Sequence, residues 1–364
     1  MSYAICSRCV MDVSDPEIVI DDVGCTHCRR FDRYFAPRWR HLRAHPELLD
    51  AELDVLRKEG KGKPYDCIVG LSGGVDSSYV ALLAKRHDLR PLAVHFDSGW
   101  NSELASANIE AIVRALGIDL HTVVCDWPEM RNLQLAFFKA SVANCDVPQD
   151  AAFVAALLEV ASRNGIRHVL SGHNVATESV MPKAWGYTSR DLRHIRAIHR
   201  KFGDGTPLRR YPQMGFVRQF LYYPYVRRIR TLRILDYLPY DKDAAKQALI
   251  RELGWRDYGG KHYESRFTKF FQSYYLPVKF GFDKRRAHCS ALILAGLMTR
   301  AEALEKLAEP PFDPARIGED KSYVAKKLGV SDAEFDAILA RPPRSYRDYA
   351  HNRIIDFVRE RRHA

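Results

Sequence analysis

The alternation of apolar and polar positions from residue 65 onward predicts short buried strands, each followed by an amphipathic helix. Four apolar runs have the length of strands: 67–71, 92–96, 121–124 and 168–170. Strands that alternate with helices form a parallel sheet that is covered by helices on both faces. We therefore predict an α/β fold with a doubly wound parallel sheet.

The pattern divides the chain into five regions. Residues 1–35 hold two closely spaced pairs of cysteines, and 36–64 predict a helical connector that ends in a Gly/Lys/Pro stretch. The strand–helix core covers 65–182, a basic and less regular region covers 183–290, and helices are expected over 291–364. This order predicts a cysteine module, an ATP-binding α/β core, a substrate-binding region and a helical C-terminal region.

The apolar runs are too short for a membrane protein. None reaches the roughly 18 residues that a membrane-spanning helix needs. The first ten residues lack the charged and then apolar segments of a secretory signal. We expect a cytoplasmic protein that does not enter the membrane.

The loop after the first predicted strand combines glycines, hydroxyl side chains and one carboxylate. Glycines let the backbone approach an anion, and the backbone N–H groups and dipole of the following helix favour negative charge. A carboxylate in such a loop indicates Mg²⁺ between it and the phosphates. The chain lacks the G-x-x-x-x-G-K-[ST] pattern of the common phosphate loop. The predicted ligand-binding residues are Ser72, Gly73, Gly74, Asp76, Ser77 and Ser78.

This loop, SGGVDSS, resembles the signature of the PP-loop ATP pyrophosphatases. The resemblance implies that ATP is cleaved between its α- and β-phosphates and that a carbonyl-type oxygen is adenylated. A nitrogen or sulfur nucleophile then displaces AMP. In a parallel sheet the ligand lies at the carboxyl ends of the strands, so Asp97, which follows the second strand, is a further candidate.

The segment after the fourth predicted strand resembles a second PP-loop feature, the sequence GHN. The resemblance implies that Gly172, His173 and Asn174 contribute to the nucleotide site. The family often continues with paired aspartates and a glutamate, but here alanine and threonine replace the aspartates. Glu178 is therefore the carboxylate that we expect to share Mg²⁺ with Asp76.

Four cysteines near the N-terminus have the spacing of a metal site. Two C-x-x-C pairs, separated by fifteen residues, are typical of a structural zinc ribbon, and four thiolates complete a tetrahedral Zn²⁺ shell. Disulfides and an iron–sulfur cluster are the alternatives. We expect zinc on Cys6, Cys9, Cys25 and Cys28.

The positive charge of the chain is concentrated in one region. The net charge is +11, but residues 183–290 contain 24 Lys and Arg against 9 Asp and Glu, a net of +15. The remainder therefore carries −4. A local excess of this size favours an anionic partner such as a nucleotide-linked substrate, a nucleic acid or an acidic protein, although a solvated basic surface has the same composition.

The most distinctive part of this basic region is 259–288, where Lys and Arg alternate with Phe and Tyr. Basic residues bind phosphates, and aromatic rings stack on a base or a sugar face. The run suits a nucleotide sugar or an RNA. A basic surface helix with an aromatic core stripe is the structural alternative.

Together with the N-terminal cysteines and the two loops, this run resembles the N-acetyl sugar amidotransferases, over about residues 5–305. The resemblance implies adenylation of the acetamido oxygen of a UDP-linked N-acetyl sugar. Ammonia then replaces that oxygen to give an acetamidino sugar for lipopolysaccharide O-antigen synthesis, with release of AMP and pyrophosphate. It implies a separate glutaminase with a cyclase-like companion as ammonia source, and no nucleic acid. The residues assigned on this basis are Lys261, His262, Glu264, Arg266 and Lys269 with Asp76 for catalysis, and Arg285 and Arg286 for substrate binding.

Two other functions fit parts of the sequence. A tRNA-thiolating PP-loop enzyme would explain the cysteine pairs and the basic charge, but no C-x-x-C occurs after residue 28. A non-enzymatic module that retains the fold would not need the intact SGGVDSS loop. We expect Asp76 and the 259–288 run to distinguish these alternatives from a sugar amidotransferase.

Overall fold

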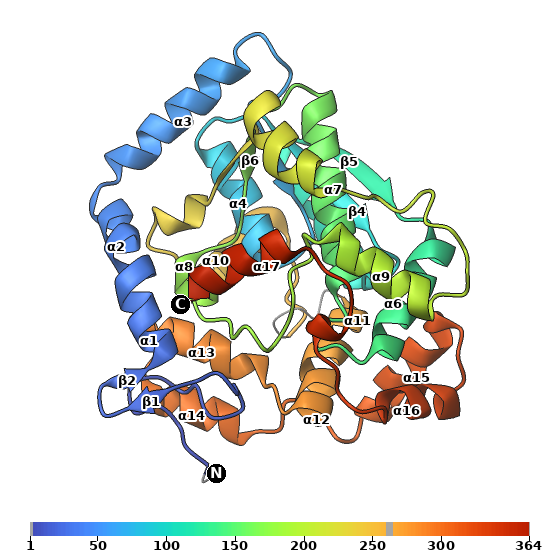
Figure 1. Ribbon diagram of the computed structural model, residues 1–364. Coiled ribbons are helices and arrows are strands. Elements are labelled where there is room, and N and C mark those ends of the chain that lie inside the picture. The colour runs from blue at the N-terminus through green and yellow to red at the C-terminus, as the bar shows by residue number, and fades with distance from the viewer. Residues whose placement is uncertain (1–2, 260–264, 364) are drawn as a thin grey trace.

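A computed structural model of the chain describes residues 3–259 and 265–363 (Figure 1). Its centre is a five-stranded sheet in which all neighbouring strands are parallel. In spatial order the strands are β5 (Asp119–Val124), β4 (Pro91–Asp97), β3 (Cys67–Gly70), β6 (His168–Leu170) and β7 (Arg230–Leu232). The predicted α/β fold with a parallel sheet is confirmed. The last strand, β7, comes from the basic region, and the division into five regions remains a prediction.

The order of the strands places a switch point between β3 and β6. The chain proceeds from β3 to β4 and β5 on one side, and then returns to β6 and β7 on the other. Ile68 of β3 lies opposite Leu92 of β4 and Val169 of β6, so β3 is the central strand. Ligands of such sheets bind at the carboxyl ends of the strands beside the switch point. Both loops singled out in the sequence leave the sheet there.

Alternate residues of the strands face two separate apolar cores, as the side-chain period of a strand requires. One core joins Val69 and Ala93 to helices α3 (Glu47–Gly60), α4 (Val75–Arg86), α5 (Glu103–Leu116) and α10 (Lys242–Leu253). The opposite core joins Ile68 and Val94 to α7 (Val147–Arg163). The strands β3, β4 and β6 are thus buried on both faces, which explains their apolar sequences, whereas the edge strands β5 and β7 are largely exposed.

The remaining elements of the central part connect this sheet to the site. They are α6 (Trp127–Ala140), α8 (Val175–Glu178), α9 (Leu192–Phe202), the π-helix η2 (Arg218–Val226) and the 3-10 helix η3 (Ile234–Asp236). Among them, α8 is a single turn that begins directly after the second loop. Its N-cap is Asn174, whose Oδ1 accepts from the backbone N–H of Thr177 at 2.9 Å.

Helices make up the C-terminal part, in agreement with the prediction. Its aromatic side chains, including Phe267, Phe270 and Phe335, are fully buried together with Phe138 of α6. The aromatic stripe of 259–288 therefore belongs largely to the core. The elements are α11 (Arg266–Phe270), η4 (Phe271–Tyr275), α12 (Leu276–Phe280), α13 (Lys284–Leu294), α14 (Arg300–Ala308), α15 (Ile317–Leu328), α16 (Asp332–Leu339), η5 (Tyr346–Asp348) and α17 (Arg353–His363).

The N-terminal module lies beside α13 and α14, far from it in sequence (Figure 1). The backbone N–H of Val10 donates to Ser290 Oγ, 280 positions later, at 3.2 Å. The module contains β1 (Ile20–Asp21), β2 (Gly24–Cys25), α1 (Thr26–Arg30), η1 (Phe31–Phe35) and α2 (Ala36–Ala44). Within the residues described, no helix has both the length and the apolar character needed to span a membrane.

Candidate active site

The SGGVDSS loop joins β3 to the N-terminus of α4 as a tight turn. Gly73 has φ +81°, and a Cβ there would lie 2.7 Å from the carbonyl oxygen of Ala105, so the backbone conformation and the lack of space both require glycine. Ser72 Oγ accepts from the N–H of Gly74 at 3.2 Å and lies 3.1 Å from Ser77 Oγ. The two serine hydroxyls and the helix N-terminus therefore point to one place, as an anion site requires.

Three aromatic side chains from the region around α10 hold this loop, and no sequence motif predicts a role for any of them. Trp255 Nε1 donates to the carbonyl of Gly73 at 2.9 Å. The hydroxyl of Tyr258 accepts from the N–H of Val75 at 3.1 Å.

The third aromatic side chain, Tyr240, donates its hydroxyl to Asp76. Burial, and then the charge of Asp76, raise the pKa of Tyr240, so the hydroxyl keeps the proton that it donates. Asp76 is thereby held in place while remaining only partly buried.

Ser78 differs from Ser72 and Ser77 in its surroundings. Its side chain is completely buried on α4, and Oγ has no hydrogen-bond partner among the described residues. Helical periodicity explains the difference, because Ser77 and Ser78 are consecutive on a helix and point in different directions. Of the three predicted serine hydroxyls, those of Ser72 and Ser77 are therefore the two that lie together at the loop.

The second loop meets the first at the switch point. A Cβ on Gly172 would lie 3.1 Å from the backbone carbon of Asp76, so the two loops are in direct contact. His173 Nδ1 pairs with the carboxylate of Glu178, and this pairing raises the pKa of His173. Asn174 is used to cap α8 and to bond the carbonyl of Gly172. The structure thus brings Asp76 and Glu178 to the same edge of the sheet.

Asp97 stabilises the loop after β4 through hydrogen bonds. Its Oδ1 accepts from the N–H of Gly99 at 2.8 Å and from Asn101 Nδ2 at 3.2 Å. Asn101 in turn forms a β-bridge with Ser265, the N-cap of α11. Ser265, within the 259–288 run, thereby lies near the carboxyl end of β4. Three of the predicted catalytic residues, Lys261, His262 and Glu264, lie outside the described residues.

Arg266 and Lys269, two further predicted catalytic residues, form contacts within the protein. Arg266 Nη2 lies 3.3 Å and Lys269 Nζ 2.8 Å from the carboxylate of Asp320 on α15. The guanidinium of Arg266 also lies over the ring of Tyr323, 3.8 Å from its centroid. These cations connect α11 to α15, a partnership of residues about fifty positions apart that the sequence does not reveal.

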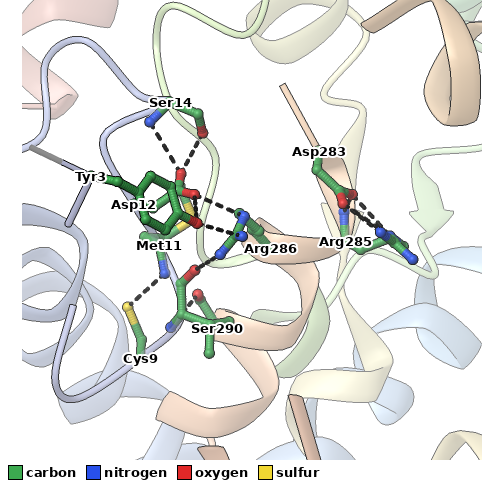
Figure 2. Close-up of polar contacts among 10 residues, drawn as sticks. Tyr3, Cys9, Met11, Asp12, Ser14, Asp283, Arg285, Arg286 and Ser290 are labelled. Carbon is green, nitrogen blue, oxygen red and sulfur yellow. Dashed lines mark hydrogen bonds and ion pairs between the residues drawn. The ribbon is translucent and has the colours of Figure 1, made fainter. Parts of the chain in front are cut away.

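Arg285 and Arg286 likewise form contacts within the protein (Figure 2). Arg286 pairs with the buried Asp12 at 2.9 Å and donates to the carbonyl of Val10 at 3.0 Å. Arg285 pairs with Asp283 at 2.7 Å and donates to carbonyls at the end of α14. These contacts attach α13 to the cysteine module and to α14, and the role of the two arginines in substrate binding remains a prediction.

Lys284, the first residue of α13, lies close to the second loop, although no sequence motif predicts a role for it. Burial lowers the pKa of Lys284, and the negative charges of Asp146, Asp150 and Glu178 raise it in part. The amine is therefore close enough to these carboxylates to interact with them electrostatically. His288, one helical turn later, has Nδ1 3.2 Å from the carbonyl of Thr177 on α8. This face of α13 is therefore turned toward the second loop, opposite the face that carries Arg286.

The four N-terminal cysteines form a compact buried cluster that fits one metal ion. Their sulfur atoms all lie within 4.8 Å of one another, and three pairs are 3.6 to 3.8 Å apart. Tetrahedral Zn–S bonds of about 2.3 Å place sulfurs about 3.8 Å apart. Backbone N–H groups of Cys9 and Met11 point at the sulfurs of Cys6 and Cys9, as thiolates require. All eight cysteines are free, so the disulfide alternative is not supported.

Comparisons with known proteins connect these features. Residues 66–257 match the family model described as asparagine synthase, and 264–362 match the C-terminal domain described as "LPS biosynthesis protein WbpG-like". The first match covers 192 of the 364 residues, which is more than half of the chain. No curated protein sequence matches the chain. Together the two family matches support ATP use and an amidotransferase type of function.

Two solved structures are similar in fold. The NMN synthetase from Francisella tularensis is 16% identical, with a TM-score of 0.39, and the match covers 79% of this chain and 97% of that one. The NH3-dependent NAD synthetase from Campylobacter jejuni, solved with a nitrate ion, is 17% identical, with a TM-score of 0.29; the match covers 45% of this chain and 72% of that one.

Proposed function

Because this chain belongs to the WbpG-like family of lipopolysaccharide biosynthesis proteins, built on an asparagine-synthase-type domain, we propose that it is a sugar amidotransferase. It adenylates the acetamido oxygen of a nucleotide-linked N-acetyl sugar and replaces that oxygen with ammonia. The observation that carries the proposal is the meeting of the SGGVDSS loop with the second loop at the switch point of the sheet.

The chemistry follows from the weakness of an amide as an electrophile. The acetamido oxygen attacks the α-phosphorus of ATP, pyrophosphate leaves, and the oxygen becomes part of a good leaving group. Ammonia then attacks the imidate carbon, the C–O bond breaks, and AMP departs with the oxygen to leave an acetamidino group. Both steps depend mainly on positioning and on stabilisation of phosphate charge.

The described residues suit these tasks. The serine hydroxyls and N–H groups of the first loop bind the departing phosphates, and the adjacent Asp76 and Glu178 are the carboxylates suited to Mg²⁺. Lys284 and His288 face the same edge of the sheet from α13. A bound Mg²⁺ would neutralise the pyrophosphate charge. Lys261, His262 and Glu264 remain predicted catalytic residues.

We further propose that the cysteine cluster holds structural Zn²⁺. Arg300 donates to the carbonyls of Cys6 and Cys9, so the cluster is attached to α14 as well as to α13. Elemental analysis of the purified chain should give one zinc per chain, and Cys25→Ser should lose the metal and lower the melting temperature. Iron with a visible charge-transfer band would contradict this assignment.

The test of the reaction uses ATP, Mg²⁺, an ammonium salt and a panel of UDP-linked N-acetyl sugars. We expect AMP to form and the product to contain NH in place of the acetamido oxygen, as seen by mass spectrometry. Ammonia is expected to come from a separate glutaminase with a cyclase-like companion, so free ammonium should replace both. AMP formation that depends on tRNA, with no change in any sugar, would contradict the proposal.

A further inference from the structure

The basic region contains a second feature, which the proposed function does not use. A groove of about 420 Å³ lies along α9, between that helix and the segments 215–216 and 350–355. This volume falls within the range of small-molecule sites, about 300 to 1,000 Å³. None of its lining residues belongs to the SGGVDSS or second loop. We refer to it as the arginine groove.

Three guanidinium groups of α9 line this groove: those of Arg193, Arg196 and Arg200. Their spacing of three and four places them on one face of the helix. Among the described residues none of the three forms an ion pair with a carboxylate, in contrast to Arg266, Arg285 and Arg286. Like charges gathered on one helix face destabilise it unless an anion compensates them. The face is therefore suited to an anionic ligand.

The single carboxylate that lines the groove, that of Asp191, offsets at most one of the three arginine charges. Asp191 caps α9 by accepting from the N–H groups of Arg193 and His194, and it also accepts from the hydroxyl of Tyr187 at 2.8 Å and from the N–H of Asn352 at 2.6 Å. Its oxygens are thus occupied by the protein.

The groove is built on an ordered platform. Ile195 and Ile198 on the opposite face of α9 are fully buried in the main core. Arg196 is oriented by Gln213, whose Oε1 accepts from its Nε at 3.0 Å and its Nη2 at 2.8 Å. Phe216 adds an aromatic ring to the groove, and Phe220 supports that ring with a centroid separation of 4.9 Å. Ordered cations beside a ring fit a phosphorylated ligand that carries a base.

The length of the cationic row determines the class of ligand. Arg193 and Arg200 are seven residues apart, about 10 Å along a helix axis. One phosphate would engage only part of this row, whereas linked phosphates would engage all of it. We propose that the arginine groove binds a nucleoside diphosphate group, with the phosphates on α9 and the base on Phe216. This site goes beyond the proposed function, because it lies on residues other than those of the ATP loops.

The experiment separates this site from the ATP loop. UDP is titrated by calorimetry into the full chain carrying Asp76→Asn, and into the same chain with Arg193→Gln, Arg196→Gln and Arg200→Gln added. We expect UDP binding to survive Asp76→Asn and to weaken at least tenfold in the combined variant. Arg40→Gln, an exposed arginine on α2, is the matched control and should leave UDP binding unchanged. Circular dichroism checks that each variant is folded.

Three outcomes overturn the proposal: no UDP binding to the Asp76→Asn chain, equal UDP binding with and without the three arginines, or salt-dependent binding of a tRNA transcript that needs the arginines while UDP does not bind. If UDP binds as expected, kinetics identify the source of the diphosphate. A KM raised for the UDP-linked sugar but not for ATP assigns the groove to the acceptor, and an unchanged KM for both assigns it to a free nucleotide.

Discussion

The edge of the sheet around Asp76 and the first turn of α13 around Arg285 differ in how their charged groups are used. At the sheet edge, within the described part of the chain, the side chains of Ser72 and Ser77 form hydrogen bonds only inside their own loop, and Asp76 accepts from one neutral hydroxyl. On α13, both arginines have their donors distributed over carboxylates and carbonyls of the protein (Figure 2). The first arrangement leaves capacity for a ligand, and the second does not.

This difference limits the functional conclusions that can be drawn from a charged sequence motif alone. A loop such as SGGVDSS specifies its own backbone geometry, so its function follows from consecutive residues. A run of cations specifies nothing about its partners, which here are Asp12, Asp283 and Asp320.

The largest effect is expected at Asp76. Asp76→Asn removes the carboxylate suited to Mg²⁺ but keeps the size of the side chain, so AMP formation should fall about a thousandfold, or about 4 kcal/mol of barrier. The melting temperature should change little. Tyr240→Phe is the matched control, because it removes only the hydrogen bond to Asp76. It should lower the rate of AMP formation by about tenfold or less. Activity of Asp76→Asn within tenfold of the wild type would contradict a role for this carboxylate.

The next largest effect is on stability, at Arg286. Arg286→Ala leaves Asp12 buried without its cation, and breaking a buried pair costs about 3 to 5 kcal/mol. The free energy of unfolding, measured in urea, should fall by about that amount while KM for the sugar stays unchanged in the folded fraction. Arg285→Ala removes an ion pair that is more exposed than that of Arg286, so it should lower the free energy of unfolding by a smaller amount. A raised KM with unchanged stability would instead support the predicted role in substrate binding.

The contrast also explains what the sequence could predict. The strands were predictable because runs such as 67–71 are continuously apolar, as strands buried on both faces must be. The two loops were predictable because each follows such a strand. Tyr240, Trp255 and Tyr258 were not, because an aromatic residue that supports a loop is chemically the same as one in the core, and they are more than 160 positions away.

A moderate effect on activity is expected at Lys284. Lys284→Met keeps the length of the side chain and removes its charge, so AMP formation should fall about tenfold to a hundredfold, or 1.4 to 2.7 kcal/mol. Stability should be unchanged or higher, because burial of the amine disfavours its charged form. Lys279→Met is the control: its Nζ bonds the carbonyls of Leu339 and Arg341, so its loss should lower stability and spare activity. If Lys284→Met and Lys279→Met change activity and stability in the same way, α13 does not face the site.

The smallest effect concerns His173 and Glu178. Pairing with Glu178 raises the pKa of His173, so the pair contributes stability at low pH and loses it as pH rises through the raised pKa. The imidazole is exposed, so the contribution to stability should not exceed about 1 kcal/mol. In Glu178→Gln, a histidine NMR titration should place the pKa of His173 near the ordinary value of about 6.5. An unchanged pKa would show that the pair does not form in solution.

The same titration distinguishes two roles of Glu178. It is either a Mg²⁺ ligand together with Asp76, or a carboxylate that pairs with a cation of the protein. If Glu178 takes Mg²⁺ when ATP binds, the metal competes with His173 for the carboxylate, and the imidazole loses the partner that favours its charged form. Mg²⁺ and a non-hydrolysable ATP analogue should therefore lower the pKa of His173 in the wild type and leave it unchanged in Glu178→Gln. A pKa that does not respond to Mg²⁺ and nucleotide in the wild type would leave Asp76 as the carboxylate for the metal. Glu178 would then serve, like Asp283 and Asp12, to hold a cation of the protein in place.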